Sequence, residues 1–168
     1  MKEVYGNMLE MDGDAIVVTT NGYYTLRKKA VMGRGIALQI SRLIPTLEWD
    51  LGHKLYMEGN HVYNLFQVDN MSIVSFPVKP NHVINDGTNV VSHCKTKIGE
   101  YTVGFLAKAD VNLIEQSLKE LVQLTNENKW NRVLIPRVGC GAGELDYKDI
   151  KPLMEKYLDD RFICCTFK

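Results

Sequence analysis

The sequence predicts a three-layer α/β/α sandwich with a mixed central sheet. Apolar strand-like runs alternate with amphipathic helical runs along the chain, which places helices on both faces of one sheet. The runs Val62 to Val68 and Met71 to Pro77 are joined by Asp69-Asn70, a hairpin-like turn, so the sheet is not wholly parallel. The 168 residues fit one domain, 1–168, and no repeat or linker divides it.

Hydrophobic spacing assigns the elements of the first half. Lys2 to Tyr5 is a short strand, and the β-branched run Asp14 to Thr20 is apolar enough to be buried on both faces before the turn at Asn21-Gly22. Apolar residues on one face predict a helix from Gly35 to Ile44, which Pro45 stops. A second helix is expected over Thr46 to Glu58, with Thr46 as its cap or in its first turn.

The second half is predicted in the same way. Residues 78–109 are polar and dotted with glycines, and because so long a loop in a compact domain is usually functional, we expect a lid-like insertion. Asp110 caps a helix with a buried stripe, and Asp146 caps another from Tyr147 to Tyr157. That stripe consists of Leu113, Ile114, Leu118, Leu121 and Val122. Val133 to Pro136 and Phe162 to Phe167 are strands.

Composition excludes several classes of function. Twenty basic and twenty acidic residues cancel, so no global field draws the chain to a nucleic-acid backbone or a membrane surface. The first residues lack the apolar core of a signal peptide and no run could span a bilayer, so a cytoplasmic location and no membrane partner are expected. The four cysteines and four histidines lack metal-ligand spacing, which predicts reduced thiols and no metal site.

Two glycine-rich loops are the strongest candidates for a binding site. They are Met32-Gly33-Arg34-Gly35 and Gly139-Cys140-Gly141-Ala142-Gly143, and each is expected to lead from a strand into a helix. A helix N-terminus offers unpaired N–H groups, and glycines let the backbone approach a phosphate. Two such loops at one sheet edge could hold a pyrophosphate, although each alone is also a common packing solution. The chain lacks the glycine patterns of a Rossmann fingerprint and of a P-loop.

Four motifs carry a family resemblance. They are Asp14 to Asn21, Val31 to Gln39, Phe76-Pro-Val-Lys79, and Ile135 to Gly143. In order and spacing they resemble macro domains, ADP-ribose-binding modules, and in particular the phage and bacterial subgroup related to the human terminal ADP-ribose glycohydrolase and to antitoxins that remove ADP-ribose from DNA. The likeness covers nearly the whole chain. It implies a mixed sheet between helices, with ADP-ribose across the carboxyl ends of the strands.

The resemblance also implies roles for single residues. Asn21 faces the distal ribose, and Asn7 takes the position where an acidic residue often meets the adenine amine, which the Asn7 carbonyl oxygen can also accept. Lys79 matches the lysine that acts on the distal ribose in similar hydrolases. Glu144 is a candidate acid or base, because Gly143 stands where the human relative has an aspartate. The expected ligand-binding residues are Asn7, Met32, Gly33, Arg34, Gly35, Ile36, Val138, Gly139, Cys140, Gly141, Ala142 and Gly143.

Three function classes follow. The first is an ADP-ribosyl hydrolase acting on a protein, nucleic acid or small ADP-ribose derivative, with Lys79, Asn21 and Glu144 as its catalytic residues and no cofactor. The second is a non-catalytic module that reads or sequesters ADP-ribose, in which Lys79 only pairs with a phosphate or faces water. The third is an unrelated nucleotide-binding or structural α/β domain. Pro80-Asn-His82 differs from the Arg-His-Trp that related hydrolases often carry at this place, so the resemblance does not identify the leaving group.

Overall fold

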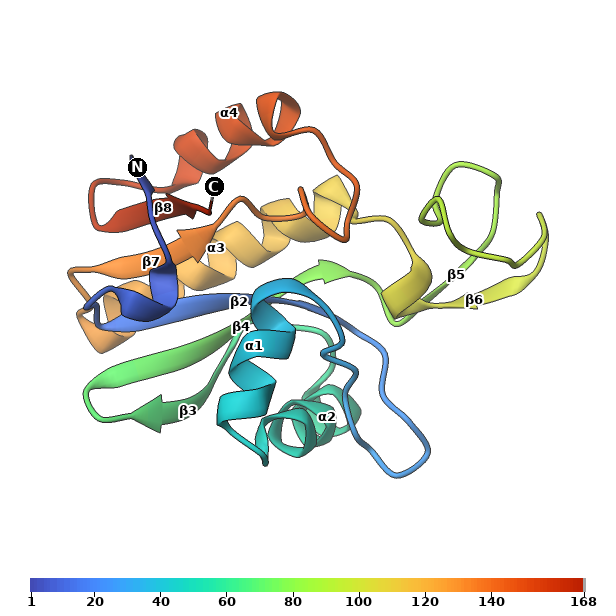
Figure 1. Ribbon diagram of the computed structural model, residues 1–168, viewed down its shortest axis with the longest axis horizontal. Helices are drawn as coiled ribbons and strands as arrows, with labels where there is room; N and C mark the ends of the chain where they lie inside the picture. The colour runs from blue at the N-terminus through green and yellow to red at the C-terminus, as the bar shows by residue number, and fades with distance from the viewer. Residues whose placement is uncertain (168) are drawn as a thin grey trace.

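The structure, a computed structural model, describes residues 1–167, so Lys168 at the end of the expected domain lies outside the described residues. A six-stranded sheet with strand order β1-β8-β7-β2-β4-β3 forms its centre (Figure 1). The strands are β1 (Lys2–Tyr5), β2 (Ala15–Asn21), β3 (Tyr63–Val68), β4 (Met71–Lys79), β7 (Val133–Pro136) and β8 (Phe162–Thr166). The helices are α1 (Gly35–Leu43), α2 (Leu47–Glu58), α3 (Val111–Asn128) and α4 (Tyr147–Tyr157).

Helices cover both faces of this sheet, as the sequence predicts. The central strand β2 shows why: Ala15 and Val17 pack with α3 and α4, whereas Ile16 and Val18 pack with α1 and α2. All four side chains are buried, because successive residues of a strand point to opposite faces. The three-layer α/β/α sandwich is therefore confirmed.

The sheet is mixed, which is also confirmed. Strands β1, β8, β7, β2 and β4 run parallel to their neighbours, whereas β3 pairs antiparallel with β4. The hairpin between β3 and β4 turns at Asp69, which has a φ of 51°. Because five neighbouring strands run in one direction, their carboxyl ends lie along one edge of the sheet.

The predicted helix starts are confirmed by their caps. The Asp110 carboxylate accepts hydrogen bonds from the backbone N–H groups of Asn112 and Leu113 at the start of α3. The Asp146 carboxylate accepts one from the N–H of Lys148 at the start of α4. Thr46 precedes α2 without a side-chain bond to the helix backbone, and its hydroxyl donates to Asp50 instead.

The segment between β4 and α3 is more ordered than its composition suggests. Strand β4 continues through residues 78 and 79, so the insertion begins at Pro80. Strands β5 (His82–Ile84) and β6 (Tyr101–Val103) then form an antiparallel pair that extends away from the sheet, followed by the 3-10 helix η2 (Gly104–Leu106) (Figure 1). Polar side chains hold this segment together, because the buried Asn85 amide donates to Thr96 and the Thr96 and Thr102 hydroxyls lie 2.6 Å apart.

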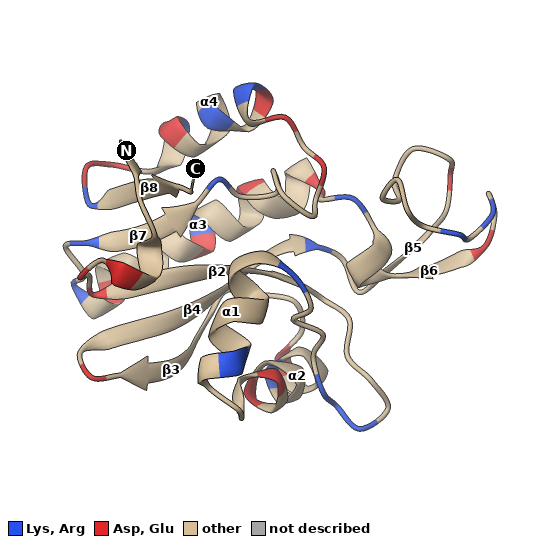
Figure 2. Cartoon of the chain, in the orientation of Figure 1, with Lys and Arg blue, Asp and Glu red and all other residues tan. Residues whose placement is uncertain are grey.

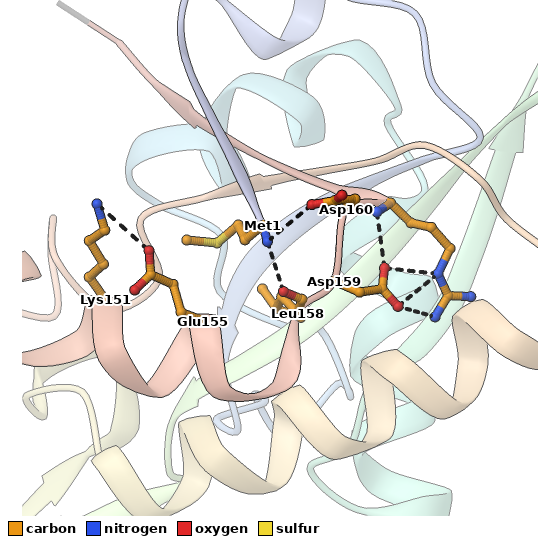
Figure 3. A network of polar contacts seen from close by, with 7 residues as sticks. Met1, Lys151, Glu155, Leu158, Asp159 and Asp160 are labelled. Carbon is orange, nitrogen blue, oxygen red and sulfur yellow. Dashed lines mark hydrogen bonds and ion pairs between the residues drawn. The ribbon is translucent and has the colours of Figure 1, made fainter.

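The amino terminus is tied to the carboxyl-terminal part of the chain. The Met1 ammonium group donates to the Leu158 carbonyl oxygen at 2.9 Å and lies 4.0 Å from an Asp160 carboxylate oxygen (Figure 3). These contacts hold β1 beside β8, and a 3-10 helix, η1 (Met8–Glu10), follows. None of the helices described within residues 1–167 is both long and apolar enough to cross a membrane.

Candidate functional site

A cavity of about 920 Å³ lies along the carboxyl edge of the sheet. Its walls include residues that end five neighbouring strands or follow them within two residues, namely Asn7, Thr166, Arg137, Asn21 and Lys79. Neighbouring strands lie about 4.8 Å apart, so four steps from β1 to β4 span roughly 19 Å. The cavity is thus long enough for an extended dinucleotide-like ligand, and its size lies in the usual range for small-molecule sites.

The first glycine loop borders the cavity at the start of α1. Gly35 is the first residue of this helix and has a φ of 58°, a conformation that favours glycine. A Cβ atom added at Gly33 would meet its nearest neighbour, a Val31 methyl group, at 4.0 Å, and one added at Gly35 would meet nothing within 4 Å. Protein packing therefore does not require glycine at Gly33, and the open space beside both residues belongs to the cavity.

The second glycine loop differs from the sequence expectation. Residues 144–146 separate it from α4, so its N–H groups are not those of a helix start. Added Cβ atoms at Gly139 and Gly143 would come within 2.9 Å and 2.5 Å of other atoms, whereas Gly141 has nothing within 4 Å. The outer glycines thus allow the loop to pack, and Gly141 leaves space on the cavity side. The anion site of a helix N-terminus is confined to the first loop.

Asn21 joins the end of β2 to the first loop. Its side-chain amide donates to the Val31 carbonyl oxygen at 2.9 Å, and its side-chain oxygen accepts from the Tyr23 N–H at 3.0 Å. Asn21 lines the cavity, so its expected place near a ribose stays a prediction. In this structure its side chain holds Val31 and thereby positions the loop.

Lys79 is a buried ammonium group at the β4 end of the cavity. Only 6% of the residue is exposed, and Nζ donates a hydrogen bond to the Phe105 carbonyl oxygen at 3.1 Å. Burial lowers the pKa of this amine to about 8, with Glu144 opposing and Arg34 adding to the shift. A lysine in this state supplies a reactive amine near neutral pH.

Asn7 lies at the opposite end of the cavity and caps η1. Its side-chain oxygen accepts from the Leu9 N–H at 3.1 Å, and its amide donates to Glu10 at 3.0 Å. The oxygen keeps a second lone pair, so acceptance of a hydrogen bond from an adenine amine stays a prediction.

Glu144 does not line the cavity, because its carboxylate is bonded to Ser92. Its backbone φ is 59°, and its carboxylate accepts hydrogen bonds from the Ser92 N–H at 2.9 Å and hydroxyl at 2.8 Å. These bonds lower the pKa of Glu144. An Arg34 guanidinium nitrogen also lies 3.4 Å from His93 Nε2. The Ser92-His93 dipeptide therefore joins the two glycine loops.

Solved structures of macrodomain proteins superpose on this one. The macrodomain of Mycobacterium tuberculosis DarG superposes with a TM-score of 0.69 at 21% identity, covering 98% of this chain and 95% of that chain. Thermosipho africanus DarTG in complex with ADP-ribose gives a TM-score of 0.70 at 16% identity, covering 99% of this chain and 42% of that one. The chain has the macrodomain fold.

Sequence comparison finds curated relatives that share one name. The DNA ADP-ribosyl glycohydrolase of M. tuberculosis is 29% identical over 147 residues, which is 87% of this chain and 35% of the relative. The enzyme of the same name from Thermus aquaticus is 25% identical over 160 residues, 95% of this chain and 38% of the relative. This chain thus spans little more than a third of these relatives, and no protein-family model matches it.

Within the macrodomain fold, the structure brings most predicted site residues together. Thirteen of them line the cavity: Asn7, Asn21, Met32, Gly33, Arg34, Gly35, Ile36, Lys79, Gly139, Cys140, Gly141, Ala142 and Gly143. The other two do not, because Val138 is buried in the core and Glu144 is bonded to Ser92. Burial raises the pKa of the Cys140 thiol to about 11, so this thiol is not a nucleophile at neutral pH.

Sequence reasoning missed several residues that line the cavity. Arg137 does so just after β7 and Tyr147 at the start of α4, and His93 and Phe105 do so from the segment after β4. Arg137 stands inside the motif Ile135 to Gly143, but loop residues have no periodicity that reveals which way a side chain points. Basic residues lie at the end of β4, near the start of α1 and in the loop after β7 (Figure 2). The cavity lining holds Arg34, Lys79 and Arg137 against one carboxylate, Asp146, so it is more basic than the chain as a whole, which has no net charge.

Proposed function

We propose that this chain binds ADP-ribose in the cavity and removes it from an ADP-ribosylated macromolecule, with Lys79 acting at the distal ribose. The adenine lies at the Asn7 end, the diphosphate between the glycine loops and the distal ribose beside Lys79 and Asn21. The observation that carries the proposal is the buried amine of Lys79 at one end of a cavity about as long as an extended ADP-ribose. The names of the two DNA ADP-ribosyl glycohydrolases support ADP-ribosylated DNA as the first substrate to test.

The chemistry assigned to Lys79 needs an unprotonated amine. With a pKa of about 8, roughly a quarter of the Lys79 side chains are neutral at pH 7.5. The neutral amine attacks the anomeric carbon of the distal ribose as the bond from that carbon to the attached group breaks, and the amine proton passes to the leaving atom. Water then hydrolyses the lysine adduct, which restores the amine and releases ADP-ribose.

A second candidate is an ADP-ribose reader without catalysis. Gly143 has no carboxylate at the position of the aspartate in the human hydrolase, and the Glu144 carboxylate is bonded to Ser92 instead of lining the cavity. Neither Gly143 nor Glu144 therefore supplies a carboxylate to the cavity lining, and general acid–base help is what glycosidic cleavage usually needs.

One experiment separates the two candidates. The protein is titrated with ADP-ribose by calorimetry and then incubated separately with ADP-ribosylated DNA and ADP-ribosylated protein, while free ADP-ribose is measured. We expect micromolar binding, about −7 to −9 kcal/mol, and release from at least one substrate. Binding without release favours the reader. No binding at millimolar ligand contradicts both candidates.

A further inference from the structure

Arg137 has an unusual environment for a charged side chain in this protein. It directly follows β7, is half-buried and lines the cavity. Among residues 1–167 its guanidinium makes no hydrogen bond and no ion pair, and its Nε atom is buried without a partner. The contact it does make is with Tyr147, whose ring centre lies 4.1 Å from the guanidinium carbon.

Nearby acidic groups do not satisfy this guanidinium. Glu3 lies close enough for the Arg137 charge to lower the pKa of its carboxyl group. However, the Glu3 carboxylate accepts hydrogen bonds from the Tyr147 hydroxyl at 2.7 Å and from the Lys151 ammonium group, not from Arg137. These bonds fix Tyr147 as a rigid platform under Arg137. By contrast, Arg161, a comparable partly exposed arginine, bonds to Asp159 and Asn126. A buried donor without an acceptor costs free energy, so the arrangement favours an acceptor from outside the chain.

The position of β7 identifies which part of a ligand this acceptor belongs to. Strand β7 is third of the five strands along the edge, about two strand spacings from the Asn7 end and two from the Lys79 end. The middle of an ADP-ribose laid along this edge is its diphosphate. The Arg137 guanidinium stacks on Tyr147, whose hydroxyl contacts Glu3 of β1 and Cys164 of β8. These two strands lie between β7 and the Asn7 end of the cavity, which is the adenosine side.

We propose that Arg137, stacked on Tyr147, binds the phosphate on the adenosine side of the ligand through paired N–H donors. The planar guanidinium matches the geometry of a phosphate, and one face on an aromatic ring leaves its edge free to donate. Arg137 is then a specificity residue that requires a phosphate next to the adenosine. The inference rests on the proposed function, because it takes the ligand to be ADP-ribose lying in the stated direction.

The test compares Arg137→Met with the wild type against ADP-ribose, AMP and adenosine, by calorimetry or by competition. Arg137→Met should weaken ADP-ribose and AMP by the same factor, about 10- to 100-fold, and leave adenosine within about twofold. Arg137→Lys keeps the positive charge but loses the paired N–H donors, so its affinity for ADP-ribose and AMP should fall by an intermediate factor. Arg42→Met, which removes an exposed arginine outside the cavity, should change none of the three affinities.

The outcomes are distinct from failure of the proposed function. If the wild type binds no ADP-ribose, the proposed function is wrong and the Arg137 inference with it. If the wild type binds and Arg137→Met binds equally well, only the inference is overturned. An equal loss for adenosine also overturns it, because the contact would then be to the nucleoside. The unliganded Arg137→Met protein should melt close to the wild type, since the substitution removes no hydrogen bond or ion pair and the methionine can still pack on Tyr147. If it is unstable, Arg137→Lys gives the same comparison.

Discussion

Asn21 lies opposite Lys79 across the β2–β4 ladder because the register shifts by one residue after Thr20. Thr20 pairs with Pro77, so Val78 is passed over and the two polar residues become neighbours at the cavity. The Lys79 carbonyl oxygen also accepts from the Gly22 N–H and from the Asn60 amide, each at 3.0 Å. The backbone of Lys79 is therefore held independently of its side chain, and side-chain substitutions at this position test chemistry rather than fold.

Replacing Lys79 should separate turnover from binding. Lys79→Ala is expected to bind ADP-ribose within about tenfold of the wild type, or about 1.4 kcal/mol, because the adenosine and diphosphate contacts lie elsewhere. Single-turnover release should fall at least about a hundredfold, since a group at the reacting carbon acts mainly in the transition state. Lys119→Ala, far from the cavity on α3, is the control. Weaker binding with unchanged release would make Lys79 a phosphate partner instead.

The pKa of Lys79 predicts a rate that rises with pH. Below the pKa of about 8 the neutral amine increases tenfold per pH unit, so single-turnover release should climb from pH 6.5 and level off near pH 9. ADP-ribose affinity, measured over the same range, corrects for effects on binding. A rate that falls across this range would show that the protonated amine is the active form.

The same burial predicts a stability change of defined sign. An unfolded lysine keeps its proton up to a pKa of about 10.5, whereas folded Lys79 loses it near pH 8. Between these values the unfolded chain binds more protons, so the free energy of unfolding contributed by Lys79 rises with pH. Lys79→Met should be more stable than the wild type at pH 7, by about 1 to 3 kcal/mol, and lose this advantage towards pH 10. Urea unfolding of both proteins at each pH measures the difference.

Substitutions at Gly33 and Gly143 should have opposite effects, the first on ligand binding and the second on stability. Gly33→Glu is expected to abolish ADP-ribose binding and preserve the fold, because the position is open and a carboxylate there repels the phosphates. Gly33→Ala, which adds only a methyl group in open space, is the matched control and should bind within about tenfold.

Gly143→Ala should instead destabilise the protein by about 1 to 3 kcal/mol, since its Cβ would lie 2.5 Å from the Gly139 carbonyl oxygen and 2.6 Å from the Ala109 Cβ. Calorimetric titration and thermal melting separate the two effects. Normal ligand affinity in Gly33→Glu would mean that the first loop is not the site.

The role of Glu144 can be decided with two variants. Glu144→Gln keeps acceptors for both Ser92 bonds, so turnover within about tenfold of the wild type is expected if the carboxylate only anchors the segment after β4. Glu144→Ala should then increase hydrogen exchange across residues 86–100, because that anchor is lost. A fall of a hundredfold in turnover for Glu144→Gln, with unchanged ADP-ribose affinity, would instead support the acid or base role.

Regular elements were predictable because their patterns are local. The spacing of Ile114, Leu118 and Leu121 identified the buried face of α3, and the apolar run of β2 identified a strand covered on both sides. The positions of loop side chains were not predictable, because they depend on partners distant in the sequence. Glu144 is held by Ser92, 52 residues away, and Arg137 stacks on Tyr147, whose hydroxyl is in turn held by Glu3. The residue-level roles at the cavity therefore stay predictions.

The pairing of β1 with β8 has a consequence for protein synthesis. Strand β1 is made before its partner β8, which ends at Thr166, so β1 has no place in the sheet until residues 6–166 have also left the ribosome. Lys79 and both glycine loops exist before that moment, whereas Asn7 reaches the cavity only when β1 docks. The end of the cavity assigned to adenine is thus completed last, and a nascent chain acquires its full site only once β1 and β8 have paired.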